Sequence, residues 1–140
     1  MKAGKADIKI TGVQMCGEES DTTVTISEGT YTVTRDGCVM EYIENVAEDM
    51  EVHNTITITS GQALIAKHGA IESKMQFIPG EMSNAEYRTP FGNIDMDIAC
   101  ERIDWEEEER AAEGKIVYRL YSGGQPVADC ITTIEVRLVP

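Results

Sequence analysis

The sequence contains no long hydrophobic run, few aromatic residues and few basic ones. Its apolar runs are only a few residues long, which excludes a transmembrane helix. Twelve lysines and arginines stand against 25 aspartates and glutamates, giving a net charge of −13. Because nucleic acids and anionic membranes are bound through lysine and arginine, this charge argues against both as partners. The first ten residues lack an apolar core of signal-peptide length, so we expect a cytoplasmic protein.

Motifs for catalysis, phosphate binding and metal binding are also missing. No HExxH, GxSxG, P-loop or Rossmann fingerprint is present, and no two cysteines have CxxC spacing. His53 begins a predicted strand and His68 lies in a predicted turn, but neither has a placed carboxylate or nucleophile beside it. We therefore predict no catalytic residue, no metal site and no cofactor, and the sequence favours a role other than catalysis.

Alternation of apolar and polar residues with period two runs through most of the chain. The apolar positions of three segments show it most clearly: Ile94, Met96, Ile98 and Cys100; Ile116, Tyr118 and Leu120; Ile134, Val136 and Leu138. Successive side chains of a strand point to opposite faces, so this period predicts half-buried antiparallel sheet. Turn residues such as Asp36-Gly37, Ser60-Gly61 and Pro79-Gly80 separate the predicted strands.

About ten strands are expected. Their ranges are 7–15, 22–26, 31–35, 38–43, 52–59, 62–67, 71–78, 82–88, 93–105, 115–121 and 127–138. The second and third ranges form one strand or two, and range 93–105 is one long strand or two short ones. Residues 44–50 are predicted to be a polar loop, and only residues 106–113 have helix-forming composition. No linker or repeat divides residues 1–140, so we predict a single domain. Consecutive strands joined by tight turns favour an all-β, up-and-down barrel of about 8–10 strands over a sandwich.

Three segments resemble a known family. They are HGAIESKMQFIPGE (68–81), NAEYRTPFGNIDMDI (84–98) and GKIVYRLYSGGQPV (114–127). Their most specific part is the element Tyr87-Arg88-Thr89-Pro90-Phe91-Gly92. Together the three segments resemble the YwiB-like family of small bacterial proteins of unknown function. The resemblance covers the chain from Thr32 to the end and implies a calycin or lipocalin-like β-barrel. It implies little about activity, because a fold does not fix a function.

A barrel interior and its mouth are the expected place for a site. The predicted ligand-binding residues are Arg88, Tyr87, Phe91, Lys67, Met75, Phe77, Met96 and Tyr118. Arg88 is expected to supply the counter-charge for an anionic ligand, because a guanidinium presents a planar fork of donors. Phe91 is expected to plug one end of the barrel. Lys67-His68-Gly69 departs from the family pattern, which tends to carry an arginine in this turn.

Two hypotheses of function remain open. The first is a barrel that binds a small apolar or amphipathic ligand inside. The second is an acidic interaction module with a packed interior, in which a run such as the four glutamates at residues 106–109 docks a basic protein. A homodimer is a possible assembly in either case. A ligand-sized cavity favours the first hypothesis, and a filled interior with an outer patch or a dimer seam favours the second.

The four cysteines give the first testable prediction. Cys38, Cys100 and Cys130 lie in phase with apolar neighbours, where a cysteine behaves as a small core residue. In a reducing compartment they and Cys16 should all stay reduced. Protein unfolded without reductant should therefore show four reactive thiols per chain in a colorimetric titration. Fewer than four, with air oxidation controlled, would contradict the prediction.

Overall fold

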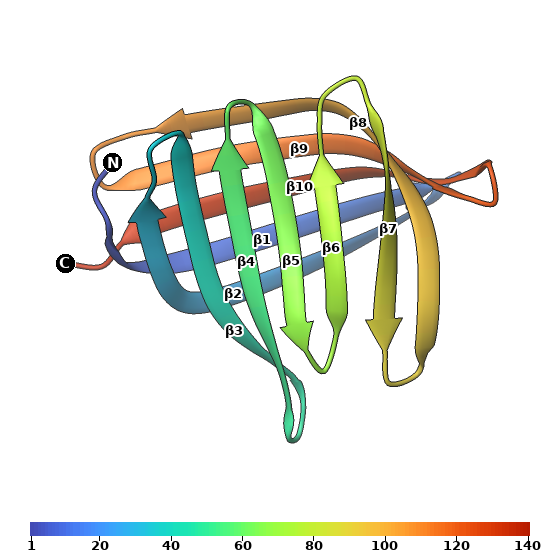
Figure 1. Ribbon diagram of the computed structural model, residues 1–140, viewed down its shortest axis with the longest axis horizontal. Helices are drawn as coiled ribbons and strands as arrows, with labels where there is room; N and C mark the ends of the chain where they lie inside the picture. Colours follow the sequence, from blue (N-terminus) through green and yellow to red (C-terminus); the bar gives the residue numbers. More distant parts are fainter.

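The structure is a computed structural model that describes residues 1–140, and it consists of ten strands without a helix (Figure 1). It therefore holds no helix that could cross a lipid bilayer. The strands are β1 (Gly4–Cys16), β2 (Glu19–Val33), β3 (Gly37–Ala47), β4 (Met50–Thr59), β5 (Gln62–Gly69), β6 (Glu72–Phe77), β7 (Met82–Thr89), β8 (Gly92–Glu107), β9 (Ala111–Ser122) and β10 (Gln125–Leu138).

The strands form a closed, antiparallel, up-and-down barrel, as predicted. Each strand pairs with the next one in the chain, and β10 pairs with β1 to close the ring. Both termini and the turns after β2, β4, β6 and β8 lie at one end, which we call the termini end. The turns after β1, β3, β5, β7 and β9 lie at the other end, the hairpin end.

Side chains that point into the barrel form one continuous core. It comprises 21 buried hydrophobic residues drawn from all ten strands. Tyr31, Phe77 and Ile8 are its largest members with no more than 1% exposure. Cys38, Cys100 and Cys130 belong to the same core, so the prediction that they serve as packing residues is confirmed.

Gly29 allows two strands of this wall to approach each other. A Cβ atom at this position would collide with the backbone carbonyl of Glu41 on β3 and with the side chain of Ile8 on β1. Only glycine therefore fits where the β2–β3 ladder begins, at the Gly29–Tyr42 pair.

Strands extend further than their composition suggests. The predicted loop at residues 44–50 is wrong: β3 continues to Ala47, and β4 starts at Met50 after a two-residue turn. Asp49 takes the left-handed conformation there, with φ of 60°. Residues 106–113 are not helical either, because the ladder between β8 and β9 continues through Glu107 opposite Ala112. In both places pairing with a neighbouring strand overrides a weak local preference.

Two ladders of the barrel are short. β2 pairs with β3 only over Gly29–Val33, so its residues 19–28 have β1 on one side and no strand on the other. β6 pairs with β7 at two positions only, Glu72 with Arg88 and Ser73 with Tyr87. The wall is therefore closed in topology but incomplete in hydrogen bonding.

The prediction that Phe91 plugs the core is wrong. Phe91 is 92% exposed and lies with Pro90 in the tight turn between β7 and β8. The Thr89 hydroxyl holds this turn, since it accepts from the Phe91 N–H (3.1 Å) and donates to the Gly92 carbonyl (2.8 Å). A turn of two residues beyond the last ladder pair is too short to bring its side chain back into the barrel.

The only two phenylalanines of the chain therefore make a matched pair. Phe77→Ala should lower the free energy of unfolding by about 3–5 kcal/mol, because Phe77 is fully buried. Phe91→Ala should change it by less than about 0.5 kcal/mol. Urea unfolding of both variants checks this. A loss at Phe91 comparable with that at Phe77 would contradict the placement of the turn.

Candidate functional site

Five inward-pointing residues form a row of polar side chains across five neighbouring strands. They are Tyr42 (β3), Asn54 (β4), Lys67 (β5), Ser73 (β6) and Tyr87 (β7), and we call them the polar row. Each lies directly opposite the next in the ladders between these strands. The row lies near the hairpin end of the barrel, since Lys67, Ser73 and Tyr87 are each within two residues of a strand end on that side.

Lys67, Asn54 and Glu44 form a closed hydrogen-bonded triangle. The Lys67 ammonium donates to Asn54 Oδ1 at 2.6 Å and to Glu44 Oε1 at 3.2 Å. The Asn54 amide donates to Glu44 Oε1 at 2.8 Å and to the Val52 carbonyl at 3.3 Å. Glu44 follows Tyr42 by two positions on β3, so it points inward as well. The triangle fixes the amine of Lys67 inside the barrel mouth.

This ion pair is largely removed from water. Asn54 is 1% exposed, and the side chains of Lys67 and Glu44 are 19% and 21% exposed. Desolvating an ammonium and a carboxylate offsets much of their attraction, so replacing such a pair by apolar residues is often neutral or stabilising. The triangle is therefore weak evidence for stability.

Ser73 is a buried hydroxyl without a partner. Its residue is 8% exposed, and its Oγ makes no hydrogen bond. It lies between Lys67 and Tyr87 in the polar row. A buried hydroxyl that makes no hydrogen bond costs about 1–3 kcal/mol.

Tyr42 and Tyr87 add two neutral hydroxyls. Burial raises the pKa of Tyr42, and the nearby Glu44 and Tyr87 raise it further. Burial and Glu44 also raise the pKa of Tyr87. Both phenols therefore keep their proton at physiological pH, and the structure gives neither hydroxyl a hydrogen-bond partner. The polar row offers more donors than the protein itself uses.

Apolar rows lie deeper in the barrel, beside the polar row. The first contains Met40, Ile56, Ile65 and Met75, and the second contains Cys38, Ile58, Ala63 and Phe77. The Phe77 ring packs edge-on against Tyr118 with centroids 4.9 Å apart. The Tyr118 hydroxyl bonds Thr132 at 3.1 Å, and burial is the main cause that raises the pKa of Tyr118 to about 12. The inner wall of β3 to β6 is therefore polar near the hairpin end and apolar deeper in the barrel.

The structure brings six of the eight predicted ligand-binding residues to the inner wall. These are Lys67, Met75, Phe77, Tyr87, Met96 and Tyr118, one or two from each of the strands β5 to β9. Arg88 and Phe91 lie outside. Arg88 follows Tyr87 by one position, so it points outward, where it binds Glu86 at 2.8 Å with its side chain 65% exposed. The basic group inside the mouth is Lys67 instead.

Four residues of this site were missed from the sequence. Tyr42, Glu44, Asn54 and Ser73 carry no motif. Asn54 gave one signal, because it stands at an inward position between Val52 and Ile56, where the pattern calls for an apolar residue. Glu44 gave none, since it lay in a segment predicted to be a loop.

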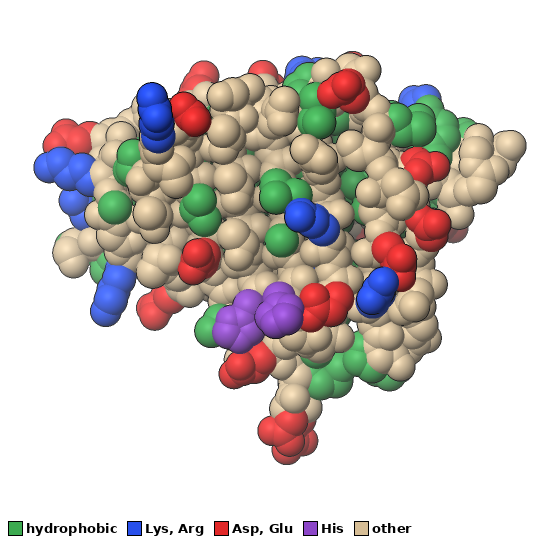
Figure 2. Space-filling model, in the orientation of Figure 1, with side chains coloured by type: hydrophobic (Ala, Val, Ile, Leu, Met, Phe, Trp, Pro, Cys, Tyr) green, Lys and Arg blue, Asp and Glu red, His purple; other side chains and the backbone are tan.

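Both histidines lie on the outer face, where His53 on β4 stands directly opposite His68 on β5 (Figure 2). His68 Nδ1 is 2.8 Å from the Glu72 carboxylate, and His53 Nε2 is 3.8 Å from that of Glu51. The predicted turn at His68 is wrong by two residues, because β5 includes both His68 and Gly69. Neither histidine reaches the polar row.

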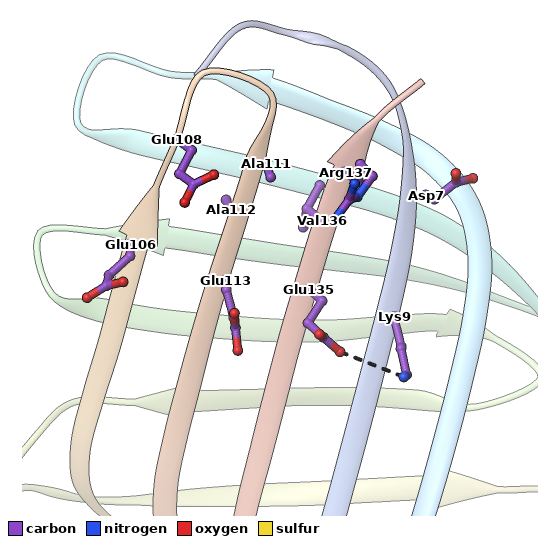
Figure 3. Close-up of a pocket in the computed structure, with 10 residues that line it drawn as sticks. All are labelled: Asp7, Lys9, Glu106, Glu108, Ala111, Ala112, Glu113, Glu135, Val136 and Arg137. Carbon is purple, nitrogen blue, oxygen red and sulfur yellow. Dashed lines mark ion pairs between the residues drawn. The ribbon is translucent and has the colours of Figure 1, made fainter. Parts of the chain in front are cut away.

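A groove of about 520 Å³ crosses the outside of strands β8, β9, β10 and β1 (Figure 3). Its lining residues are Asp7, Lys9, Glu106, Glu108, Ala111, Ala112, Glu113, Glu135, Val136 and Arg137. Five carboxylates thus face two basic groups, one of which, Lys9, pairs with Glu135 at 4.0 Å. Glu106 and Glu108 come from the acidic run noted in the sequence.

Fold and site together define a small, ten-stranded, up-and-down β-barrel with a polar mouth. The chain belongs to the family described as domain of unknown function (DUF1934), which matches residues 8–134. The resemblance seen in the sequence is confirmed by the "Uncharacterized beta-barrel protein YwiB" of Bacillus subtilis (strain 168). It is 22% identical over 98 residues, 69% of this chain and 68% of that protein. The crystal structure of YwiB superposes with a TM-score of 0.86 at 17% identity, covering 100% of this chain and 95% of the other. This likeness establishes the fold.

Two buried hydroxyls with equal exposure test the hydrogen-bond assignment. Ser73 and Thr132 are both 8% exposed, but only Thr132 has a partner. Ser73→Ala should raise the free energy of unfolding by about 1 kcal/mol, because it removes an unpaired polar group. Thr132→Val should lower it by about 1 kcal/mol, because it breaks the bond to Tyr118. Chemical denaturation measures both changes, and a loss of stability in Ser73→Ala would show that its hydroxyl is satisfied.

Proposed function

We propose that this protein binds a small amphipathic molecule at the hairpin end of its barrel. The polar group of the ligand lies on the polar row, and its apolar part lies against the inner side chains of Met75 and Met96, which are only partly buried. The observation that supports this most directly is a buried polar row whose hydrogen-bonding capacity is only partly used.

The unused groups favour a ligand that accepts hydrogen bonds. Lys67 has three N–H groups, and the structure gives partners to two of them. The hydroxyls of Ser73, Tyr42 and Tyr87 are further free donors. The main free acceptor is Glu44 Oε2, since Oε1 already accepts two bonds. A carboxylate, amide or carbonyl group therefore fits the row better than an amine.

Energetic cost supports the same conclusion. A packed apolar barrel would be at least as stable without a buried ion pair and an unpaired hydroxyl. Groups that cost stability in a folded protein are commonly found at functional sites, where a ligand completes their bonds. The polar row has this character, whereas the buried hydroxyls of Thr132 and Tyr31 elsewhere in the interior already have partners within the chain.

A second candidate function is docking of a basic protein on the outer acidic groove. The supporting observation is the excess of five carboxylates over two basic groups along one groove, on a chain of net charge −13. Such a surface steers cationic partners and repels nucleic acid.

Calorimetry with three probes of equal chain length tests the first function. Octanoate and octanamide should bind the wild-type protein, and octylamine should bind more weakly or not at all. Lys67→Met should weaken octanoate binding by about 1.5–3 kcal/mol, the range for hydrogen bonds to charged groups. Lys74→Met is the matched control, because Lys74 is an exposed, outward-pointing lysine on β6.

Native mass spectrometry of the purified protein complements the titrations by revealing any co-purified small molecule. Equal loss of binding in Lys67→Met and Lys74→Met would contradict a role for the polar row. Failure of all three probes, together with a ligand-free mass, would leave docking on the acidic groove as the better supported function.

A further inference from the structure

A second feature at the hairpin end is the free edge of β2. Residues 19–28 pair with β1 along their whole length, but β3 begins to pair with β2 only at Gly29. In an antiparallel strand every second residue directs its N–H and C=O away from the paired neighbour. This edge therefore presents backbone donors and acceptors that no other strand of the barrel uses.

The side chains of this edge also suit strand pairing. Residues 22–26 read Thr-Thr-Val-Thr-Ile, a β-branched run with no proline, lysine or arginine in or around it. Val24 and Ile26 are 53% and 73% exposed although both are apolar. Proteins usually protect such edges with lysine, proline or a bulge, and β2 pairs with β1 here in an unbroken register. The edge is a template for an added strand.

Charge indicates which strand would be added. Between Glu18 and Glu51 the chain carries ten carboxylates and one basic residue, Arg35. Glu19 and Asp21 lie on one face of the free segment, and Val24 and Ile26 lie on the opposite face. A second copy of this chain would bring like charges together, which disfavours pairing between two β2 edges.

We propose that residues 19–28 of β2 bind an extended basic segment of a partner protein as an additional strand. Main-chain hydrogen bonds supply affinity, as in other cases of strand addition. Specificity comes from an alternating pattern in the segment, with β-branched residues beside Val24 and Ile26 and lysine or arginine beside Glu19 and Asp21. This interaction is independent of the proposed small-molecule site and of the outer acidic groove.

A fluorescein-labelled peptide of alternating lysine and valine, eight residues long, tests the proposal by fluorescence anisotropy at low and at physiological salt. The wild-type protein should bind it, and a peptide of the same charge with two valines replaced by proline should bind at least tenfold more weakly. Proline cannot donate to a ladder, so this control separates strand pairing from attraction to an acidic surface.

Val24→Lys and Val33→Lys are matched variants of the protein. Both valines lie on β2 with exposures of 53% and 50%, but Val33 lies in the part that pairs with β3. Val24→Lys should weaken binding of the lysine–valine peptide at least tenfold, and Val33→Lys less than about twofold. Ile26→Lys repeats the test at a more exposed position of the free edge, and circular dichroism confirms that each variant is folded.

Four results would overturn the proposal. One is equal binding of the two peptides, and another is an equal effect of Val24→Lys and Val33→Lys, since both indicate nonspecific attraction. The third is a dimer in sedimentation experiments that Val24→Lys dissociates, because the edge is then occupied by a second copy. Absence of binding by the lysine–valine peptide would also reject it.

Discussion

Backbone pairing between β1 and β10 is the interaction on which the rest of this structure depends. It turns a meander of ten strands into a ring, and it gives every strand an inner and an outer face. Because side chains alternate along a strand, the register of the ring decides which residues share the interior. Lys67 points inward and Arg88 points outward for this reason alone, although both are basic residues near the hairpin end.

Each end of the barrel contains an inward-pointing carboxylate, and the two carboxylates differ in their hydrogen bonding. At the termini end, Glu107 accepts from the Tyr31 hydroxyl at 2.7 Å and from the Trp105 indole at 3.1 Å. These hydrogen bonds, with that from Trp105 the larger influence, hold the pKa of Glu107 below its usual range. At the hairpin end, Glu44 shares one oxygen between Lys67 and Asn54, while nearby hydroxyls stay unused. The first arrangement is complete within the chain, whereas the second leaves the Ser73 hydroxyl beside it without a partner.

Much of the fold could be predicted from the sequence, because period-two alternation and turn residues are local signals. They gave the all-β class, the approximate number of strands and the barrel. The errors fall where a ladder overrides local composition, as at residues 44–50 and 106–113. Lys67 and Tyr87 were predicted singly, but the polar row as a whole could not be predicted, since it joins residues of five strands whose lateral alignment depends on turn lengths. Asn54 illustrates this limit of the sequence. A polar residue at an inward position of a strand, where apolar residues are expected, indicates a site, but it does not identify the residues beside it.

Both proposed binding features lie at the end of the barrel where β2 and β3 are not paired. β2 and β3 are joined near the termini end, where Val33 and Cys38 flank a short turn. Beyond Gly29 the two strands separate, so the β2 edge loses its partner as the wall opens toward the hairpin end. The polar row lies on β3 to β7 at that same end, and its first member, Tyr42, stands directly opposite Gly29 in the last pair of the β2–β3 ladder. One structural feature, the short β2–β3 ladder, thus leaves backbone groups free on β2 at the end of the barrel where polar side chains remain unpaired inside.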